Sequence, residues 1–189
     1  MQITKIFTFE SSHRVLGADS ERCRKSVHGH SYKVELTLES SKLNRAMMVY
    51  DFGNLKGTVK NFIDSFDHCH LIYSKDSAEY KDFFKKMNKR WIEVPFNPTA
   101  EMISTFIFAV VNHILIYTIP SNGEGIIKIH SVKVWETATG SATCFEDDDW
   151  AWQWDLDDII YSDGVKEDWC EDLKKIFRNE MVENKPVVD

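Results

Sequence analysis

Two segments near the start of the chain place apolar side chains on one parity, and both lead into histidines. Residues 3–10 and 32–38 show this alternation, which is typical of half-buried β-strands. His13 continues the apolar parity of the first segment, and His28 and His30 continue that of the second. If the strands pair antiparallel, the three imidazoles meet at one end of the sheet, on one face. Three nitrogen ligands with an open fourth position are typical of a catalytic zinc.

A plainer explanation exists for each histidine taken alone. A single histidine at a strand end is most often a hydrogen-bonded residue, and a lone His-x-His motif is also weak evidence for a metal. The parity and position that His13 shares with the other two favour a common metal ion.

Composition limits the class of protein. The 189 residues are enough for one domain with a real core, and we treat 1–189 as one unit. A net charge of -7 argues against a nucleic-acid partner. The start of the chain shows no signal peptide, and no apolar run is long enough to span a membrane. The four cysteines lack CxxC spacing, so we expect reduced thiols and a cytoplasmic location.

The remaining pattern predicts an α+β fold. The expected order of elements is two strands, two helices and two further strands. This order gives a small antiparallel four-stranded sheet with two helices on one face. The two helices are expected from Asp51 to about Phe66 and from Asn97–Glu101 to Ile116, with a charged helical excursion over Tyr73–Arg90 between them; the later strands are expected over 126–137 and 142–146.

A C-terminal extension follows the expected core of residues 1–145. Its first part, Asp147–Asp158, is acidic and rich in tryptophan, and Val165–Glu183 has the apolar spacing of an amphipathic helix. This extension is expected to cover a sheet edge or the mouth of the site. A four-stranded sheet also leaves two unpaired edges, so we expect a homo-oligomer formed through them.

Cys23 is the candidate base or nucleophile. It lies between His13 and His28, and a nearby metal or the cations Arg22, Arg24 and Lys25 would favour its thiolate. A fourth zinc ligand or an inert loop cysteine are the alternatives.

Two further groups carry candidate chemistry. Asp67 and His68 are adjacent past the first helix, where a carboxylate can orient an imidazole for proton transfer. His70 is an alternative to His68 in this role. A simpler explanation is that a histidine here stabilises the C-terminal end of the helix. Glu136 ends a strand on its inward parity, so its carboxylate needs a ligand or a buried cation as partner.

Taken together, the motifs resemble the 6-pyruvoyltetrahydropterin synthase family and its bacterial branch, the 6-carboxytetrahydropterin synthases of queuosine biosynthesis. The resemblance covers roughly residues 1–145, and six motifs in the same order are far more specific than any one of them. In chain order they are Phe9-Glu10-Ser11-Ser12-His13-Arg14, Cys23 with His28-Gly29-His30-Ser31-Tyr32, Met48-Val49-Tyr50-Asp51-Phe52, Asp67-His68, Asn97-Pro98-Thr99-Ala100-Glu101 and Val134-Trp135-Glu136-Thr137.

The resemblance implies a role for each matching residue. It places Zn²⁺ on His13, His28 and His30, the catalytic cysteine at Cys23 and the catalytic pair at Asp67 and His68. The pterin-holding glutamate falls on Glu136. The family's tunnelling fold further implies that three subunits close a barrel, which stacks into hexamers with active sites between subunits.

The implied substrate is 7,8-dihydroneopterin triphosphate. Arg14, Arg24 and Lys25 are our candidates for binding its triphosphate, with plain surface side chains as the alternative. The favoured product is 6-carboxy-5,6,7,8-tetrahydropterin, with acetaldehyde and triphosphate released. A 6-pyruvoyltetrahydropterin synthase is the nearest rival, and a non-catalytic pterin- or zinc-binding protein is a rival of another class. A zinc hydrolase is disfavoured because no His-Glu-x-x-His motif is present.

Three features depart from the family pattern. The spacing between Cys23 and His28 varies between branches, the segment 73–95 is longer than usual, and the resemblance says nothing about the chain after about residue 145.

Overall fold

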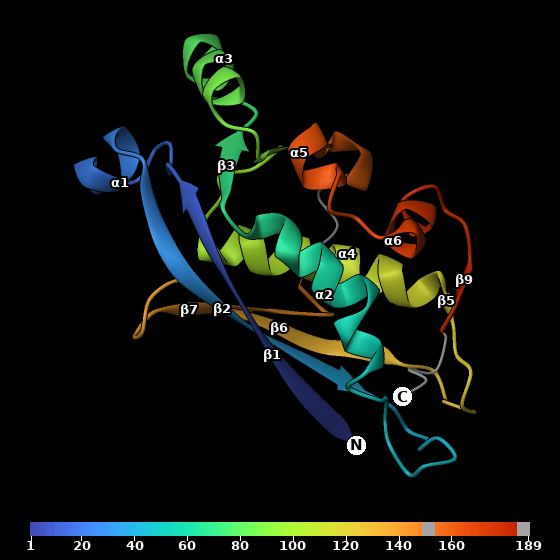
Figure 1. The fold of residues 1–189 in the computed structure, drawn as a ribbon. Coiled ribbons are helices and arrows are strands. Elements are labelled where there is room, and N and C mark those ends of the chain that lie inside the picture. Colours follow the sequence, from blue (N-terminus) through green and yellow to red (C-terminus); the bar gives the residue numbers. More distant parts are fainter. Residues whose placement is uncertain (149–153, 185–189) are drawn as a thin grey trace.

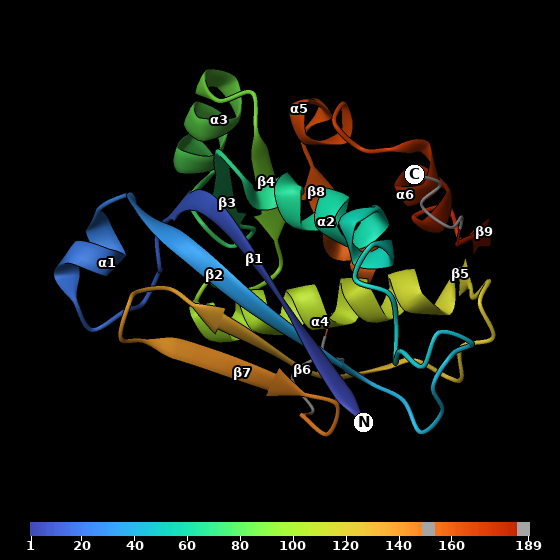
Figure 2. The same ribbon diagram turned by 60° about the horizontal axis from the view of Figure 1, so that its bottom comes forward.

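The computed structural model describes residues 1–148 and 154–184. Its centre is a mixed seven-stranded sheet in the order β7-β6-β2-β1-β3-β4-β8, and β5 and β9 form a separate pair (Figures 1 and 2). The strands are β1 (Gln2–His13), β2 (His28–Glu39), β3 (Cys69–Tyr73), β4 (Trp91–Val94), β5 (Thr118–Ile119), β6 (Lys128–Trp135), β7 (Ser141–Phe145), β8 (Ile160–Tyr161) and β9 (Val182–Glu183).

The four expected strands are present as the antiparallel half of this sheet. β1 and β2 pair over their whole length, from Gln2 opposite Glu39 to His13 opposite His28. β6 pairs antiparallel with β2 and with β7. The register brings the ends of β1 and β2 that carry the histidines together, as the shared parity predicts.

The expectation of a small four-stranded sheet was wrong, because β3, β4 and β8 extend it. β3 runs parallel to β1 and β4 parallel to β3, while β8 adds to β4 antiparallel. β3 and β4 are short and buried at nearly every residue, so they lack the period-two alternation that reveals a half-buried strand.

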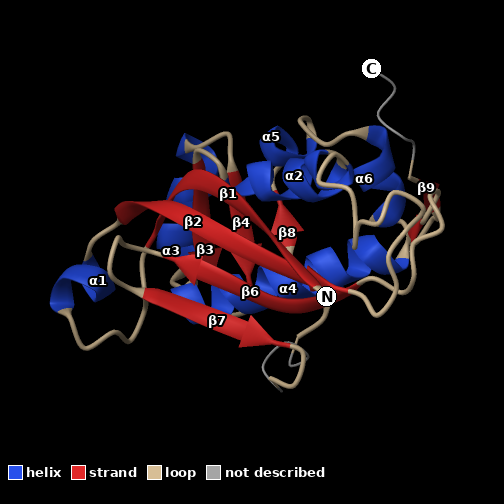
Figure 3. Ribbon diagram, turned by 90° about the horizontal axis from the view of Figure 1, so that it is seen from below, coloured by secondary structure: helices blue, strands red, loops and turns tan. Residues whose placement is uncertain are grey.

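The principal helices cover one face of the sheet, and the opposite face of β1, β2, β6 and β7 is seen in Figure 3. α4 begins where expected, with the Thr99 hydroxyl accepting a hydrogen bond from the Met102 amide. The first expected helix is instead divided into three short pieces: it is interrupted at Gly57, and its end is a 3₁₀-helix. Its inner residues Leu55 and Phe62 are nevertheless buried, as expected. The bounds are η1 (Asn54–Lys56), α2 (Thr58–Ile63), η2 (Asp64–Phe66) and α4 (Ala100–Ile116).

Two helices lie outside this layer. α1 (Glu21–Lys25) sits at the tip of the β1–β2 hairpin, and α3 (Ala78–Met87) projects beside β3 (Figures 1 and 2). α3 confirms the helical excursion expected over residues 73–90. No helix of the described residues is long and apolar enough to cross a bilayer.

The extension covers a sheet edge through β8, but its expected single helix was wrong. Residues 163–183 form α5 (Asp163–Lys166), α6 (Glu171–Ile176) and β9, with η4 (Leu156–Asp158) before them. Asn179 has a positive φ of 61°, which no continuous helix allows. Trp169, Leu173 and Ile176 are nevertheless buried, so the apolar spacing marked the core-facing residues correctly. Trp150 and Trp152 lie outside the described residues.

Candidate metal and catalytic site

The three histidines meet at the end of the β1–β2 hairpin where residues 14–27 connect the two strands. Their potential ligand atoms lie within 4.8 Å of one another, with His13 buried and the other two partly exposed. Among the described residues they form the one cluster of this kind, and neither Cys23 nor Glu136 joins it. The cluster therefore offers three nitrogen donors, with no fourth protein ligand among the described residues.

Hydrogen bonds fix which nitrogen each ring presents. His13 Nδ1 donates to the Pro98 carbonyl at 2.6 Å, and His28 Nδ1 donates to the Ser26 carbonyl at 3.1 Å. A carbonyl only accepts, so both Nδ1 atoms carry a proton, and in the neutral form of each ring the lone pair is on Nε2. Such backbone bonds are the usual way in which metal-binding imidazoles are oriented.

The spacing of these lone pairs fits a bound cation. His13 Nε2 and His28 Nε2 are 3.1 Å apart, although neither has a proton to share. Two nitrogens on a tetrahedral zinc, with bonds of 2.0–2.1 Å, would be about 3.3 Å apart. This pair of nitrogens thus has the spacing of two ligands on one metal ion.

Burial favours the neutral form of His13 and His30, which is the form in which an imidazole binds a metal. Desolvation lowers the pKa of His13 to about 4, against the opposing effect of the Pro98 hydrogen bond, and the neighbouring His28 and His30 lower it further. Burial also lowers the pKa of His30, although Glu136 opposes that shift. Neutral imidazoles at neutral pH need not lose a proton to bind a metal.

The Asn97-Pro98-Thr99 motif supports this end of the sheet. Besides the Pro98 carbonyl on His13, the Asn97 side-chain amide donates to the Leu16 carbonyl at 2.6 Å. Thr99 starts α4 immediately afterwards. Residues 97–99 therefore cap α4, orient the His13 ring and anchor the loop after β1. The sequence pattern did not indicate the last two of these roles.

Glu136 faces the open side of the histidine cluster. It follows β6, and its Oε1 lies 3.6 Å from His13 Nε2 and 3.9 Å from His30 Nε2. The Tyr32 hydroxyl donates to the same oxygen at 3.5 Å, and burial together with Glu136 raises the pKa of Tyr32. The Glu136 side chain keeps 30% of its surface exposed, so it can accept hydrogen bonds from a ligand beside the metal.

Cys23 lies in α1, in the loop between the metal ligands. It is a free, half-buried thiol. The Val15 amide donates to the Cys23 carbonyl at 3.0 Å, which draws α1 back beside the end of β1. The thiol is therefore held at the same end of the sheet as the histidines.

Asp67 and His68 end a sharp turn, which we call the Asp-His corner (residues 64–68). Asp67 Oδ2 accepts from His68 Nδ1 at 2.8 Å, and Asp67 Oδ1 accepts from the Glu10 amide at 2.9 Å. Burial would raise the pKa of Asp67, but the bonds from Glu10 and His68 outweigh it, and the pKa is lowered. His68 has a φ of 53° and a largely exposed ring. In the described residues the pair's hydrogen bonds do not reach the metal cluster.

His70, the alternative to His68, is enclosed by other side chains. Its ring contacts the Ser12 hydroxyl and the Tyr80 hydroxyl, each at 2.9 Å, and stacks on Phe84. Desolvation lowers its pKa to about 4. This setting is that of a packing residue between β1 and α3.

The three expected phosphate-binding cations have different surroundings. Arg14 pairs with the buried Asp76, and its Cζ lies 3.8 Å from the centre of the Tyr80 ring. Arg24 donates to the Ala18 carbonyl at 2.7 Å, and Lys25 pairs with Glu21 at the surface. Asp76 and Tyr80 come from the long connection, and no local signal linked them to Arg14.

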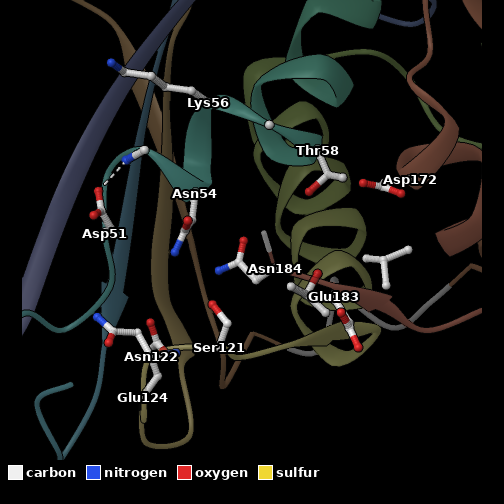
Figure 4. Close-up of a pocket in the computed structure, with 14 residues that line it drawn as sticks. Asp51, Asn54, Lys56, Thr58, Ser121, Asn122, Glu124, Asp172, Glu183 and Asn184 are labelled. Atoms are coloured by element: carbon white, nitrogen blue, oxygen red, sulfur yellow. Dashed lines mark hydrogen bonds between the residues drawn. The ribbon is translucent and has the colours of Figure 1, made fainter. Parts of the chain in front are cut away.

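A polar hollow lies elsewhere, between the segment after Asp51 and the C-terminal strand (Figure 4). Thr118, at the far end of α4, lines it, whereas Pro98 at the near end contacts His13. A helix of this length spans about 25 Å. The hollow holds none of the expected site residues.

Comparison with known proteins agrees with the geometry. The model of the family described as 6-pyruvoyl tetrahydropterin synthase matches residues 2–147. A Helicobacter pylori protein named 6-carboxy-5,6,7,8-tetrahydropterin synthase is 37% identical over 145 residues, which is 77% of this chain and 72% of the relative. A namesake from Aquifex aeolicus is 32% identical, over 75% of this chain and 95% of its own.

Solved structures share the fold at lower identity. An uncharacterized protein from Wolinella succinogenes aligns with a TM-score of 0.58 at 23% identity, covering 78% of this chain and 98% of its own. The Caenorhabditis elegans 6-pyruvoyl tetrahydropterin synthase aligns with a TM-score of 0.52 at 21% identity, covering 77% of this chain and 94% of its own. The expected membership is confirmed: the chain belongs to the 6-pyruvoyl tetrahydropterin synthase family.

Proposed function

We propose that the chain is a 6-carboxy-5,6,7,8-tetrahydropterin synthase, a lyase of queuosine biosynthesis. It would convert 7,8-dihydroneopterin triphosphate and water to the carboxypterin, acetaldehyde and triphosphate. The observation that carries the proposal is the identity of 31–37% to several relatives bearing this name. The convergence of three imidazoles beside a carboxylate gives those names a matching site.

His13, His28 and His30 would hold a zinc ion. Three imidazole nitrogens with an open fourth position suit zinc, and the spacing of the His13 and His28 Nε2 atoms agrees with its bond lengths. Zinc, when bound, supplies Lewis acidity that polarises the oxygen atoms of the substrate side chain.

Glu136 would hold the pterin ring. Its partly exposed carboxylate can accept two hydrogen bonds from the donor edge of the ring, which sets the orientation of the substrate beside the metal. The Tyr32 hydroxyl holds the carboxylate from the core side.

Cys23 and the Asp67–His68 pair would move the protons. The Cys23 thiolate takes a proton from the substrate side chain, and His68, held by Asp67, exchanges protons as triphosphate leaves. Arg14, Arg24 and Lys25 remain our candidates for the triphosphate.

The active site would be completed by a second subunit. His68 has an exposed ring whose hydrogen bond goes to Asp67 and not to the histidine cluster. Residues 2–10 of β1 have no strand partner on the side away from β2 among the described residues. A trimer or hexamer closed through the outer edges of β1 and β7 would bring the Asp-His corner of one protomer to the metal of the next.

The direct test is to incubate the zinc-loaded protein with 7,8-dihydroneopterin triphosphate and identify the products by mass spectrometry. We expect the carboxypterin and acetaldehyde in equal amounts. A 6-pyruvoyl product would favour the rival synthase, and pterin binding without turnover would favour a non-catalytic binding protein. Elemental analysis should find about one zinc per chain, and a protein that purifies without it and binds none would contradict the metal assignment.

A further inference from the structure

Arg90 joins the Asp-His corner to the C-terminal extension. Its side chain is only 19% exposed, and its Nε donates to the Asp67 carbonyl at 2.9 Å. Nη2 donates to the Asp64 carbonyl at 3.0 Å. Nη1 donates to the Gly164 carbonyl at 3.0 Å and to the carboxylate of Asp168. One side chain therefore connects two parts of the chain that are about 100 residues apart.

The Asp-His corner is a conformation that needs such support. His68 adopts a left-handed φ of 53°, which costs free energy for a residue with a Cβ. β1 holds the corner from one side, since the Glu10 amide donates to Asp67 and the His68 amide donates to the Glu10 carbonyl at 2.7 Å. Arg90 holds it from the other side.

The extension is shaped for close approach to Arg90. A Cβ at Gly164 would lie 2.4 Å from the Lys89 carbonyl oxygen, so only glycine allows α5 to sit this close. The Ser162 hydroxyl accepts from the Trp91 amide at 3.0 Å, which fixes the same junction one residue further on. These contacts bring the Gly164 carbonyl within reach of Arg90.

A second contact runs from the extension to the corner itself. The Trp169 indole donates to the Ser65 hydroxyl at 2.8 Å, inside the core. The extension therefore contacts the Asp-His corner both directly and through Arg90. The family model ends at residue 147, so this support lies outside the region that the family shares.

We propose that Arg90 is a positioning residue for Asp67 and His68 and that the C-terminal extension holds it in place. The inference rests on the proposed function, because it assumes that this pair transfers protons. The planar guanidinium is essential to the arrangement, since its fork reaches Asp64, Asp67 and Gly164 at once. A lysine would keep the charge but offers a single nitrogen.

The test compares R90K and G164A with wild type in the zinc-loaded protein. We expect R90K to lower kcat by about tenfold to a hundredfold, because a small misplacement of a proton-transfer group has that effect. KM should stay within about twofold, since the metal and Glu136 are untouched. G164A should also lower kcat, because the added Cβ would push α5 away from the Lys89 carbonyl. K89Q is the matched control, because the exposed Lys89–Glu167 pair at the same junction should not matter.

A double variant separates positioning from mere stability. In an H68Q background, R90K should have no further effect on kcat, because Arg90 acts through the pair that H68Q has already disabled. The inference would be overturned if R90K lowered kcat in the H68Q background by the same factor as in the wild type. It would also be overturned if R90K and G164A kept a normal kcat with an intact fold by circular dichroism. Should R90K fail to fold, G164A carries the same test alone and in the H68Q background. Full turnover in H68Q itself would instead contradict the proposed role of the pair.

Discussion

At the scale of single residues, the cluster of three histidines was predictable and the groups that support it were not. His13, His28 and His30 follow from the two-residue period of a strand, which fixes the face of every side chain once pairing is assumed. The Pro98 and Ser26 carbonyls that orient the rings are set by chain packing, which no local pattern encodes. The roles of Cys23, Asp67, His68 and Glu136 stay predictions.

Replacing Cys23 by alanine tests the base assignment. We expect C23A to lower turnover at least about a hundredfold while zinc content and pterin affinity are kept, because proton abstraction is lost and no ligand is removed. Stopped assays with isothermal titration of a pterin would measure both. C170S is the matched control, because Cys170 is an exposed thiol that caps α6 and serine can still accept the Leu173 amide. Undiminished turnover in C23A would refute the role.

The buried His70 gives a pH dependence of stability. Its folded pKa of about 4 lies below the unfolded value of 6.5, so the unfolded chain binds the proton more tightly. Stability should therefore fall as pH drops from about 6.5 towards 4, by about 2–4 kcal/mol, with no loss from this group above pH 7.

Urea unfolding of the metal-free protein at pH 7.5, 5.5 and 4.5 measures this slope. H70N should be less stable at pH 7.5, but its free energy of unfolding should decrease less than that of the wild type between pH 6.5 and 4. H130Q is the control, because His130 is a half-exposed partner of Glu39 at the surface. Equal slopes in H70N and wild type would show that the ring is not held neutral.

At the scale of elements, alternation and capping were informative, whereas short buried strands were not. β1, β2, β6 and β7 were expected, and α4 begins at the predicted cap. β3 and β4 are buried on both faces and lack this alternation, so no strand was expected at either. The amphipathic spacing of residues 165–183 located the buried face but could not reveal that the segment breaks near Asn179.

Trp169 is the element-scale test of the extension. The ring is buried, stacks on Phe177 and donates to Ser65. W169A should destabilise the protein by about 3–5 kcal/mol in urea unfolding, because a large buried ring is lost. W169F keeps a stacking ring and loses the indole donor, so it should cost about 1–3 kcal/mol. A cost below 1 kcal/mol for W169A would mean that the extension adds little to the folded core.

At the scale of the whole molecule, the proposed assembly depends on the edges of the sheet. The Phe145 amide bonds to Asp148 rather than to β6, while the Glu136 amide bonds to the Gly140 carbonyl. The antiparallel alternation then points the Thr143 amide away from β6, towards the outer edge of the sheet. The outer edge of β7 is thus equipped to extend the sheet into another copy.

Thr143 provides the test of assembly. T143P removes the outward amide without touching the β6 ladder, so we expect the oligomer to dissociate to a monomer in sedimentation velocity. T143V keeps the amide and should keep the assembly. Turnover should be lost with the assembly if sites lie between subunits. An unchanged sedimentation coefficient in T143P would exclude this edge as the interface.

The facing lone pairs of His13 and His28 have a consequence for the connection between them. A cation bound by both rings would close the fourteen-residue connection from Arg14 to Val27, which contains Cys23, into a loop. Removing the cation with a chelator would then have two effects: the site would lose its Lewis acid, and residues 14–27, which position the Cys23 thiol, would become less ordered. We expect amide hydrogen exchange to quicken across this loop on chelation while the distant strands stay protected.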